Sequence, residues 1–202
     1  MNVALIGATG NAGSRLLAEL NRRGHTVTAV VRHPEKVPAQ PGVTAKKGDV
    51  FDQQGLTDLL KGHDAIISSV HFTASDPRKL LEAVRASGVK RYLVVGGAGS
   101  LEVAPGVRLI DTPDFPEAYK GEATAGAAFL DLLRGEPELD WTFLSPSALF
   151  VPGERTGKFR LGKDQLLTSE QGSRISFEDF ALALVDELEK SAHCRQRFTV
   201  GY

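Results

Sequence analysis

Three glycines stand three residues apart near the start of the chain, at Gly7, Gly10 and Gly13. They follow the apolar, strand-like run Val3–Ile6 and precede a helical pattern of apolar residues. A tight turn out of a strand needs one glycine, close approach of a pyrophosphate to the backbone needs a second, and close packing of the helix on the sheet needs a third. The N-terminus of the helix would then offer free amides to the phosphates. The spacing therefore predicts a dinucleotide-binding turn, in preference to a glycine-rich connection that binds no ligand.

A cation follows the next β-rich run, about 20 residues after the glycine turn. Arg32 and His33 stand where a cofactor with a free ribose 2′-hydroxyl usually meets Asp or Glu. An arginine there suits a 2′-phosphate, because its planar guanidinium forms paired, charge-assisted hydrogen bonds and stacks on adenine. Glu35 lies close enough to complicate this interpretation. The sequence predicts NADP (NADPH) as the cofactor in preference to NAD.

These residues need a scaffold, and the chain alternates short β-rich runs with helical stretches. The pattern predicts a Rossmann-like α/β fold with a doubly wound, mainly parallel sheet, in a single domain over residues 1–202 with a small C-terminal cap. The expected strands are 3–6, 25–31, 43–47, 64–70, 91–95, 141–144 and 197–200. The expected helices after the first, which Gly24 ends, are 56–61, 77–88, 117–134 and 176–189, the last opened by a capping box of Ser176 and Asp179.

Two stretches lack a clear period. Residues 96–116 contain repeated glycine and proline and read as a long connection, of the kind that serves as a lid or binding loop. Residues 150–167 read as a loop and a hairpin.

The composition excludes several classes of protein. The 202 residues are 42% hydrophobic and 24% charged, with a net charge of −1, so no basic face is expected for nucleic acid or an anionic membrane. No apolar run approaches the roughly 20 residues of a membrane span, and the first residues read as a strand and not as a signal peptide, so a cytoplasmic location is expected. The single cysteine, Cys194, cannot form an internal disulfide. Its neighbour Arg195 favours a lowered thiol pKa, but its distance in sequence from the glycine turn argues against redox catalysis. The histidines show no metal-ligand spacing, so no metal is expected.

Further strand ends carry motifs that, with the glycine turn and Arg32, point to a known family. The chain resembles the atypical short-chain dehydrogenase/reductase superfamily and, more narrowly, the NAD(P)H-flavin reductases related to biliverdin reductase B and to NmrA-like proteins. The resemblance covers essentially the whole chain. It rests on Gly48-Asp49-Val50, Ser68-Ser69-Val70 and Gly96-Gly97-Ala98-Gly99-Ser100, while Leu144-Ser145-Pro146 and Arg174-Ile175-Ser176 mark the subgroup and not a substrate.

The resemblance implies a set of cofactor contacts, all at strand ends where a doubly wound sheet has its crevice. The glycine turn would wrap the pyrophosphate, the residues after the third strand would border the adenine, those after the fourth would lie beside the ribose, and the end of the sixth strand would flank the nicotinamide. The implied residues are Gly7, Thr9, Gly10, Asn11, Ala12, Gly13, Arg32, Asp49, Val50, Ser69, Val70, His71, Gly96 and Pro146.

The catalytic pattern of the wider superfamily is broken here. Carbonyl-reducing members use a serine and a Tyr-x-x-x-Lys pair, but Ala123 stands four residues after Tyr119, and Lys120 points about 100° away around a helix. Ser100 and Tyr119 are the candidate catalytic residues, and Ser100 reads equally well as a polar residue in a glycine turn. His71 is a weaker candidate proton donor, since a loop histidine is commonly only solvated.

The missing lysine counts against alcohol–carbonyl chemistry, in which an alkoxide must be protonated within the site. It counts less against hydride transfer to a flavin, where alignment of two rings is the main requirement and solvent can supply the proton. The sequence therefore predicts an NADPH-dependent reductase of a flavin or another planar, quinone-like acceptor. Phe115, Pro116, Phe150 and Pro152 could wall such a site, although packing is the more usual role for each.

Two other functions stay open at this point. One is an NmrA-like regulatory protein that senses NADP(H) without turnover and contacts a protein through residues 96–116. The other, a nucleotide-sugar epimerase or dehydratase, is disfavoured by the short chain and the broken Tyr-x-x-x-Lys pattern. The expected partners are a small planar acceptor and, as an alternative to a monomer, a second copy of the chain in a homodimer.

Overall fold

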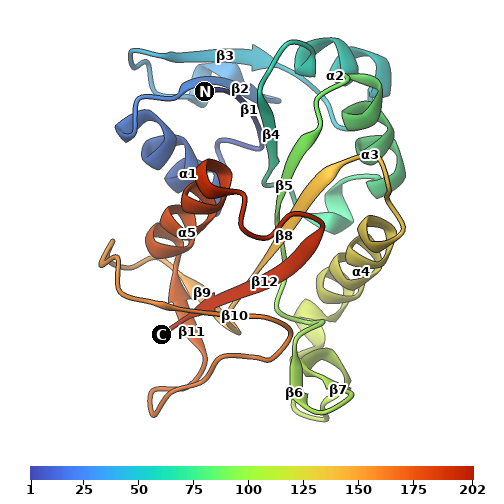
Figure 1. Ribbon diagram of the computed structural model, residues 1–202, viewed down its shortest axis with the longest axis vertical. Helices are drawn as coiled ribbons and strands as arrows, with labels where there is room; N and C mark the ends of the chain where they lie inside the picture. Colours follow the sequence, from blue (N-terminus) through green and yellow to red (C-terminus); the bar gives the residue numbers. More distant parts are fainter.

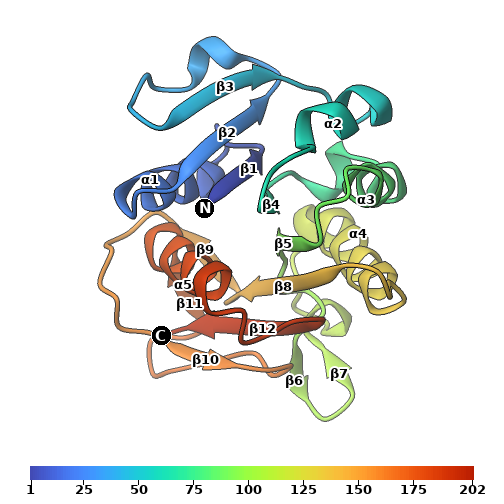
Figure 2. The ribbon, with the colours of Figure 1, turned by 45° about the horizontal axis from the view of Figure 1, so that its top comes forward.

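A computed structural model describes all residues 1–202 and centres on one eight-stranded sheet (Figures 1 and 2). The strand order is β10-β12-β8-β5-β4-β1-β2-β3, and every neighbouring pair is parallel except β10 with β12. The strands are β1 (Asn2–Ile6), β2 (Thr26–Val31), β3 (Val43–Lys47), β4 (Ala65–Ser68), β5 (Arg91–Val95), β8 (Asp140–Pro146), β10 (Arg160–Gly162) and β12 (Gln196–Gly201). This is the predicted doubly wound order, with the chain running outward in both directions from β1 and β4.

Helices cover both faces of the sheet. On one side lie α1 (Asn11–Arg22) and α5 (Phe177–Lys190), and on the other lie α2 (Gln53–Leu60), α3 (Pro77–Ala86) and α4 (Glu117–Arg134) (Figure 2). The predicted Rossmann-like α/β class is therefore confirmed.

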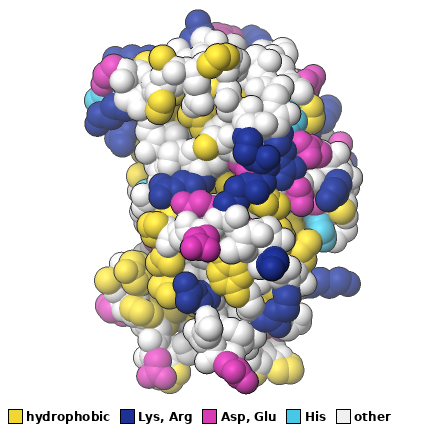
Figure 3. Space-filling model, turned by 90° about the vertical axis from the view of Figure 1, so that its left-hand side faces the viewer, with side chains coloured by type: hydrophobic (Ala, Val, Ile, Leu, Met, Phe, Trp, Pro, Cys, Tyr) yellow, Lys and Arg dark blue, Asp and Glu magenta, His cyan; other side chains and the backbone are white.

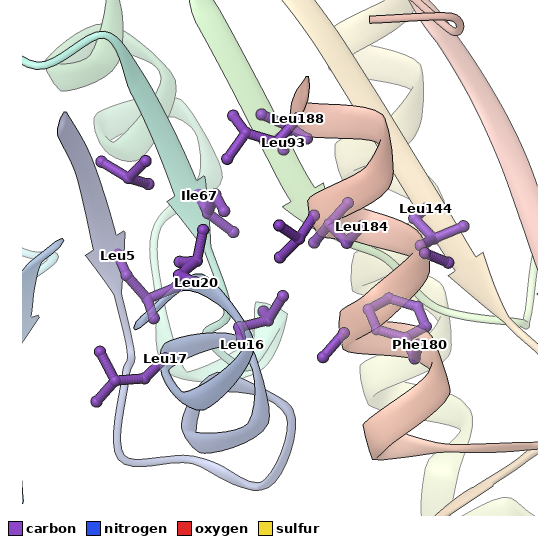
Figure 4. Packing of buried hydrophobic residues seen from close by; sticks show 14 of the residues in the cluster. Leu5, Leu16, Leu17, Leu20, Ile67, Leu93, Leu144, Phe180, Leu184 and Leu188 are labelled. Carbon is purple, nitrogen blue, oxygen red and sulfur yellow. The ribbon is translucent and has the colours of Figure 1, made fainter. Parts of the chain in front are cut away.

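Side chains that alternate along each strand divide the core into two clusters. Leu5 of β1 and Ile67 of β4 pack with α1 and α5 in a cluster of 22 buried residues (Figure 4). Their neighbours Ile6 and Ile66 point the other way, into a cluster of 20 buried residues with α2, α3 and α4. Burial of one such aliphatic side chain stabilises the fold by about 1.5–3 kcal/mol, so the strands are held by both faces at once.

Three of the five α-helices begin with a side-chain cap, and of these the sequence predicted the Ser176 cap of α5. Asp52, Asp76 and Ser176 each accept hydrogen bonds from amides in the first turns of α2, α3 and α5. Asp179 does not complete the expected capping box, because its carboxylate accepts hydrogen bonds from residues 156 and 157 instead. Helix α1 begins after Gly10 with no side-chain cap at all, which leaves its first-turn amides for another acceptor.

Two expectations need correction. Residues 150–167 do not form a hairpin: β9 (Leu149–Val151) pairs in parallel with β11 (Arg174–Ser176), and β10 joins the main sheet beside β12. The partners lie too far along the chain for a local pattern to reveal them. Residues 96–116 are also more ordered than expected, since β6 (Glu102–Ala104) and β7 (Val107–Arg108) form a hairpin that projects from the body (Figure 1).

None of the five α-helices combines the length and the apolar character that a bilayer crossing requires.

Candidate cofactor-binding site

The glycine turn lies at the point where the strand order reverses. The amide of Gly7 donates to the carbonyl of Val30 in β2 at 3.0 Å, and the amide of Ser69 donates to the carbonyl of Ile6 at 2.9 Å. The turn is thus bounded by β2 on one side of β1 and by β4 on the other. Ligands of open α/β sheets bind at this topological position.

A side chain would have a different effect at each of the three glycines. Gly7 has φ +83°, and a Cβ there would lie 2.2 Å from the carbonyl oxygen of Ser69. A Cβ at Gly13 would lie 2.1 Å from the carbonyl oxygen of Gly7, so α1 packs directly on the turn. At Gly10 the nearest atom would be 3.5 Å away, which is ordinary contact. The fold itself therefore requires Gly7 and Gly13, whereas Gly10 leaves room for a ligand to approach the backbone.

The amides of this turn lack protein acceptors. The first amide of α1 that bonds within the chain is that of Ser14, which donates to the carbonyl of Gly10 at 2.9 Å. Before it, Thr9, Asn11, Ala12 and Gly13 donate their amide hydrogens to no protein group. Free amides beside the positive end of the helix dipole form an anion site. These residues fit a pyrophosphate.

Arg32 stands exposed immediately after β2, and its side chain makes no hydrogen bond or ion pair. The acid that complicated the sequence interpretation has a different partner, because Glu35 lies 3.2 Å from Nδ1 of His33. The guanidinium is therefore available to a ligand.

The segment after β3 is held by backbone contacts. Oδ1 of Asp49 accepts the amide hydrogen of Phe51 at 2.9 Å, and Val50 packs against the α2–α4 cluster. A Cβ at Gly48 would lie 2.5 Å from Cγ1 of Val30, which draws this segment close to the end of β2. Asp49 and Val50 thus stand at the strand end next to that of Arg32.

A glutamate that the sequence did not single out holds the segment after β4. Glu122 of α4 accepts the amide hydrogens of Phe72 at 2.7 Å and Thr73 at 3.0 Å, and lies 3.3 Å from Nδ1 of His71. Burial opposes ionisation, but the hydrogen bonds from Thr73 and Phe72 hold the pKa of Glu122 below its usual value. The contact joins residues about 50 apart, and no local motif marks it. Ser69, Val70 and His71 are therefore positioned partly by α4.

Replacing Glu122 with glutamine is expected to lower the free energy of unfolding by about 1–2 kcal/mol, because a neutral amide accepts these hydrogen bonds more weakly. Urea unfolding measures this change. Glu117→Gln on the same helix is the control, since its side chain is 89% exposed. Equal stability of the two variants would show that Glu122 does not anchor the segment.

The remaining predicted contacts lie at the ends of β5 and β8. The amide of Gly96 donates to the carbonyl of Leu144 at 2.8 Å, and a Cβ at Gly96 would lie 2.3 Å from the ring of Phe143. Pro146 is buried as the last residue of β8. The structure therefore places the predicted cofactor residues at the carboxyl ends of β1, β2, β3, β4, β5 and β8.

The two candidate catalytic residues have different surroundings. Oγ of Ser100 accepts a hydrogen bond from Nη1 of Arg197 at 3.2 Å, and Arg197 is fixed in turn by Asp164 at 2.6 Å. This network ties the turn after β5 to β12 and gives Ser100 a structural role. No hydrogen bond joins Ser100 to Tyr119, whose side chain is 67% exposed. Their catalytic assignment stays a prediction.

Tyr119 nevertheless has the freest hydroxyl among the three tyrosines. The hydroxyl of Tyr92 is fully buried against Ser68 at 2.9 Å, and that of Tyr202 donates to Asp179 at 2.8 Å. Only Tyr119 has a phenol that is open to a ligand.

The surroundings of Phe150 and Cys194 decide two further predictions. The ring of Phe150 packs on the rings of Phe177 and Phe180, with centroids 4.5 and 4.7 Å away. Phe150 is therefore a packing residue and does not line a substrate site. The pKa of Cys194 is raised and not lowered, because partial burial and the neighbouring Asp140 outweigh the lowering effect of Arg195.

A family model described as NAD(P)H-binding matches residues 7–190. The chain belongs to this NAD(P)H-binding family. YwnB of Bacillus subtilis is 40% identical, over 99% of this chain and 98% of that protein. A Bacteroides thetaiotaomicron structure named a "putative epimerase" is 43% identical with a TM-score of 0.95, over 100% of this chain and 96% of the other. A Streptococcus pneumoniae "putative NADH-flavin reductase" is 41% identical with a TM-score of 0.84, over 100% and 99% of the two chains.

The resemblance drawn from the strand-end motifs is confirmed by these relatives, and the chain is an oxidoreductase-like member of the family.

Proposed function

We propose that this protein is an NADPH-dependent reductase that transfers hydride to a flavin or another planar, quinone-like acceptor. The observation that carries the proposal is the glycine turn with free amides beside an unpaired Arg32. One relative at 41% identity bears the name of an NADH-flavin reductase, which supports this acceptor class.

The chain's own residues would bind and orient. Thr9 through Gly13 would hold the pyrophosphate with backbone amides, and Arg32 would hold the 2′-phosphate. Asp49 and Val50 would border the adenine, the segment clamped by Glu122 would lie along the ribose, and Pro146 with Gly96 would flank the nicotinamide. When bound, NADPH supplies the hydride, so the protein needs no metal and no covalent nucleophile for this step.

Proton supply separates this reaction from carbonyl reduction. With Ser100 engaged by Arg197 and Ala123 in the place of a lysine, the chain lacks the assembled triad that protonates an alkoxide. A reduced flavin can take its proton from water, and Tyr119 is the one phenol open to assist. The same gap counts against the epimerase chemistry named for the Bacteroides relative.

Turnover is tested by the loss of NADPH absorbance when FMN, riboflavin or a quinone is added to the protein. We expect steady oxidation with at least one of these acceptors. Tight NADPH binding without turnover on any of them would contradict the proposal and favour the alternative, an NmrA-like sensor of NADP(H). Preferential binding of oxidised cofactor, with a partner captured only in its presence, would identify that sensor.

Arg32→Glu tests the choice of cofactor. The substitution replaces a guanidinium, which can form two hydrogen bonds to the 2′-phosphate, with a carboxylate that repels it. NADPH affinity is therefore expected to fall by about 100-fold or more, with little loss for NADH. Titration calorimetry with both cofactors measures the ratio. Arg78→Glu, which reverses an exposed arginine at the start of α3, is the matched control. Unchanged NADPH affinity in Arg32→Glu would refute the 2′-phosphate assignment.

A further inference from the structure

A second polar site lies on the outer face of α1. A cleft of about 130 Å³ opens between α1, α5 and the segment 152–159, which we call the strap. On the face shown in Figure 3, basic side chains form a band across the middle of the molecule, interspersed with acidic ones. The residues lining the cleft are Arg15, Ala18, Glu19, Arg22, Arg155 and Glu178.

One buried carboxylate is shared by three guanidinium groups. Glu19, whose side chain is 4% exposed, accepts from Nη2 of Arg22 at 2.6 Å and from Nε of Arg23 at 2.7 Å. Arg155 of the strap donates to both of its oxygens, at 2.9 and 3.0 Å. Five N–H groups converge on this carboxylate, so it has no capacity left to bind another cation.

The guanidinium groups that face the cleft have unused hydrogen-bond donors. The lining holds three arginines and two glutamates. Arg23, which also bonds Glu19, pairs with Asp186 and Glu189, each at 2.8 Å. Each of the three lining arginines keeps one terminal nitrogen without a protein acceptor, and these are Nη2 of Arg15, Nη1 of Arg22 and Nη1 of Arg155.

Ala18 leaves the floor of this cleft open. It is exposed and lies on the same helical face as Arg15 and Arg22, three residues after Arg15 and four before Arg22. A longer side chain there would fill the space between the two guanidiniums. The small residue leaves room for a ligand of a few heavy atoms.

We propose that this cleft binds a small oxyanion of the phosphate type, held by Arg15, Arg22 and Arg155. Tetrahedral oxyanions accept several charge-assisted hydrogen bonds from guanidinium groups, and one such anion would accept from these three free nitrogens. Because Arg155 belongs to the strap and the other two belong to α1, the anion would bind the strap to the helix that follows the glycine turn. The site is independent of the proposed reductase function.

The test uses inorganic phosphate as the probe and follows the melting temperature of the full chain, with sodium chloride at matched ionic strength as the reference. Phosphate is expected to raise the melting temperature of the wild type with a saturating dependence. In Arg22→Gln and in Ala18→Glu, the phosphate concentration for half the effect is expected to rise at least about tenfold. The second variant removes no arginine and places a carboxylate where it can pair with Arg22, so it keeps the fold testable.

Arg78→Gln is the control for the loss of one exposed arginine and is expected to behave as the wild type. Phosphate bound at the glycine turn would affect all four proteins alike, so only the difference between them reports on the cleft. Equal phosphate responses in all four proteins, or no response beyond that to chloride, would overturn the proposal.

Discussion

Gly13→Ala is expected to lower the free energy of unfolding by about 3 kcal/mol, a substantial fraction of the roughly 5–15 kcal/mol that stabilises a folded domain. The added methyl group would lie 2.1 Å from the carbonyl oxygen of Gly7, and backbone cannot move aside as a flexible side chain can. Relief requires α1 to move away from the sheet, which opens the α1–α5 cluster. Chemical unfolding followed by circular dichroism measures the loss, and cofactor binding should fail with it.

Gly10→Ala is the matched variant, because its methyl group would meet nothing nearer than 3.5 Å. We expect a stability change below about 1 kcal/mol, since alanine is only a poorer N-cap than glycine. NADPH affinity should nevertheless fall, because the methyl group would occupy the side from which the pyrophosphate approaches. If the two variants lost stability equally, the separate roles given to these glycines would be wrong.

Glu19→Gln is expected to cost about 3 kcal/mol, because the neutral amide cannot satisfy three guanidinium groups that converge on a buried point. The loss should loosen the strap around Arg155, which has no other acidic partner within hydrogen-bonding distance, while the bonds of residues 156 and 157 to Asp179 remain. Urea unfolding gives the stability, and limited proteolysis within residues 152–159 measures the loosening of the strap. Asp58→Asn, an exposed carboxylate paired only with Lys61 among the basic side chains, should change neither.

The contribution of Glu19 to stability depends on pH. Burial alone would raise the pKa of Glu19, but hydrogen bonds from Arg155, Arg22 and Arg23 hold it far below the ordinary value of 4.5. Because the folded pKa lies below the unfolded one, this stabilisation is fully present above about pH 4.5 and is lost progressively as the pH falls below it. Stability curves of the wild type and Glu19→Gln should therefore converge in acid. A constant difference down to pH 3 would exclude this origin.

The sequence predicted the parts of the fold that depend on local pattern. Strand β3, strand β5 and helix α4 occupy the predicted residues, because apolar periodicity and glycine punctuation act within a few positions. The glycine turn was also predictable, since the strand, turn and helix that it needs are contiguous.

Contacts between distant residues were not predictable. Arg155 and Glu19 are 136 positions apart, Phe72 and Glu122 are 50 apart, and β10 finds its partner in β12 nearly 40 residues later. The side chains involved are ordinary surface types whose burial depends on how the elements pack. For the same reason the position of Ser100 was predicted, but its engagement by Arg197 was not.

The free amides of the glycine turn make cofactor binding and substrate binding respond differently to substitutions. A phosphate held by backbone groups is insensitive to most side-chain substitutions, and in this protein the preference between the two nicotinamide cofactors would rest mainly on one exposed arginine. The proposed acceptor, in contrast, would be bordered by side chains from residues 96–116 and the segment after β8. If the proposed roles hold, side-chain substitutions around the acceptor would change the substrate while the cofactor stays the same, and one substitution at position 32 would change the cofactor while the substrate stays the same.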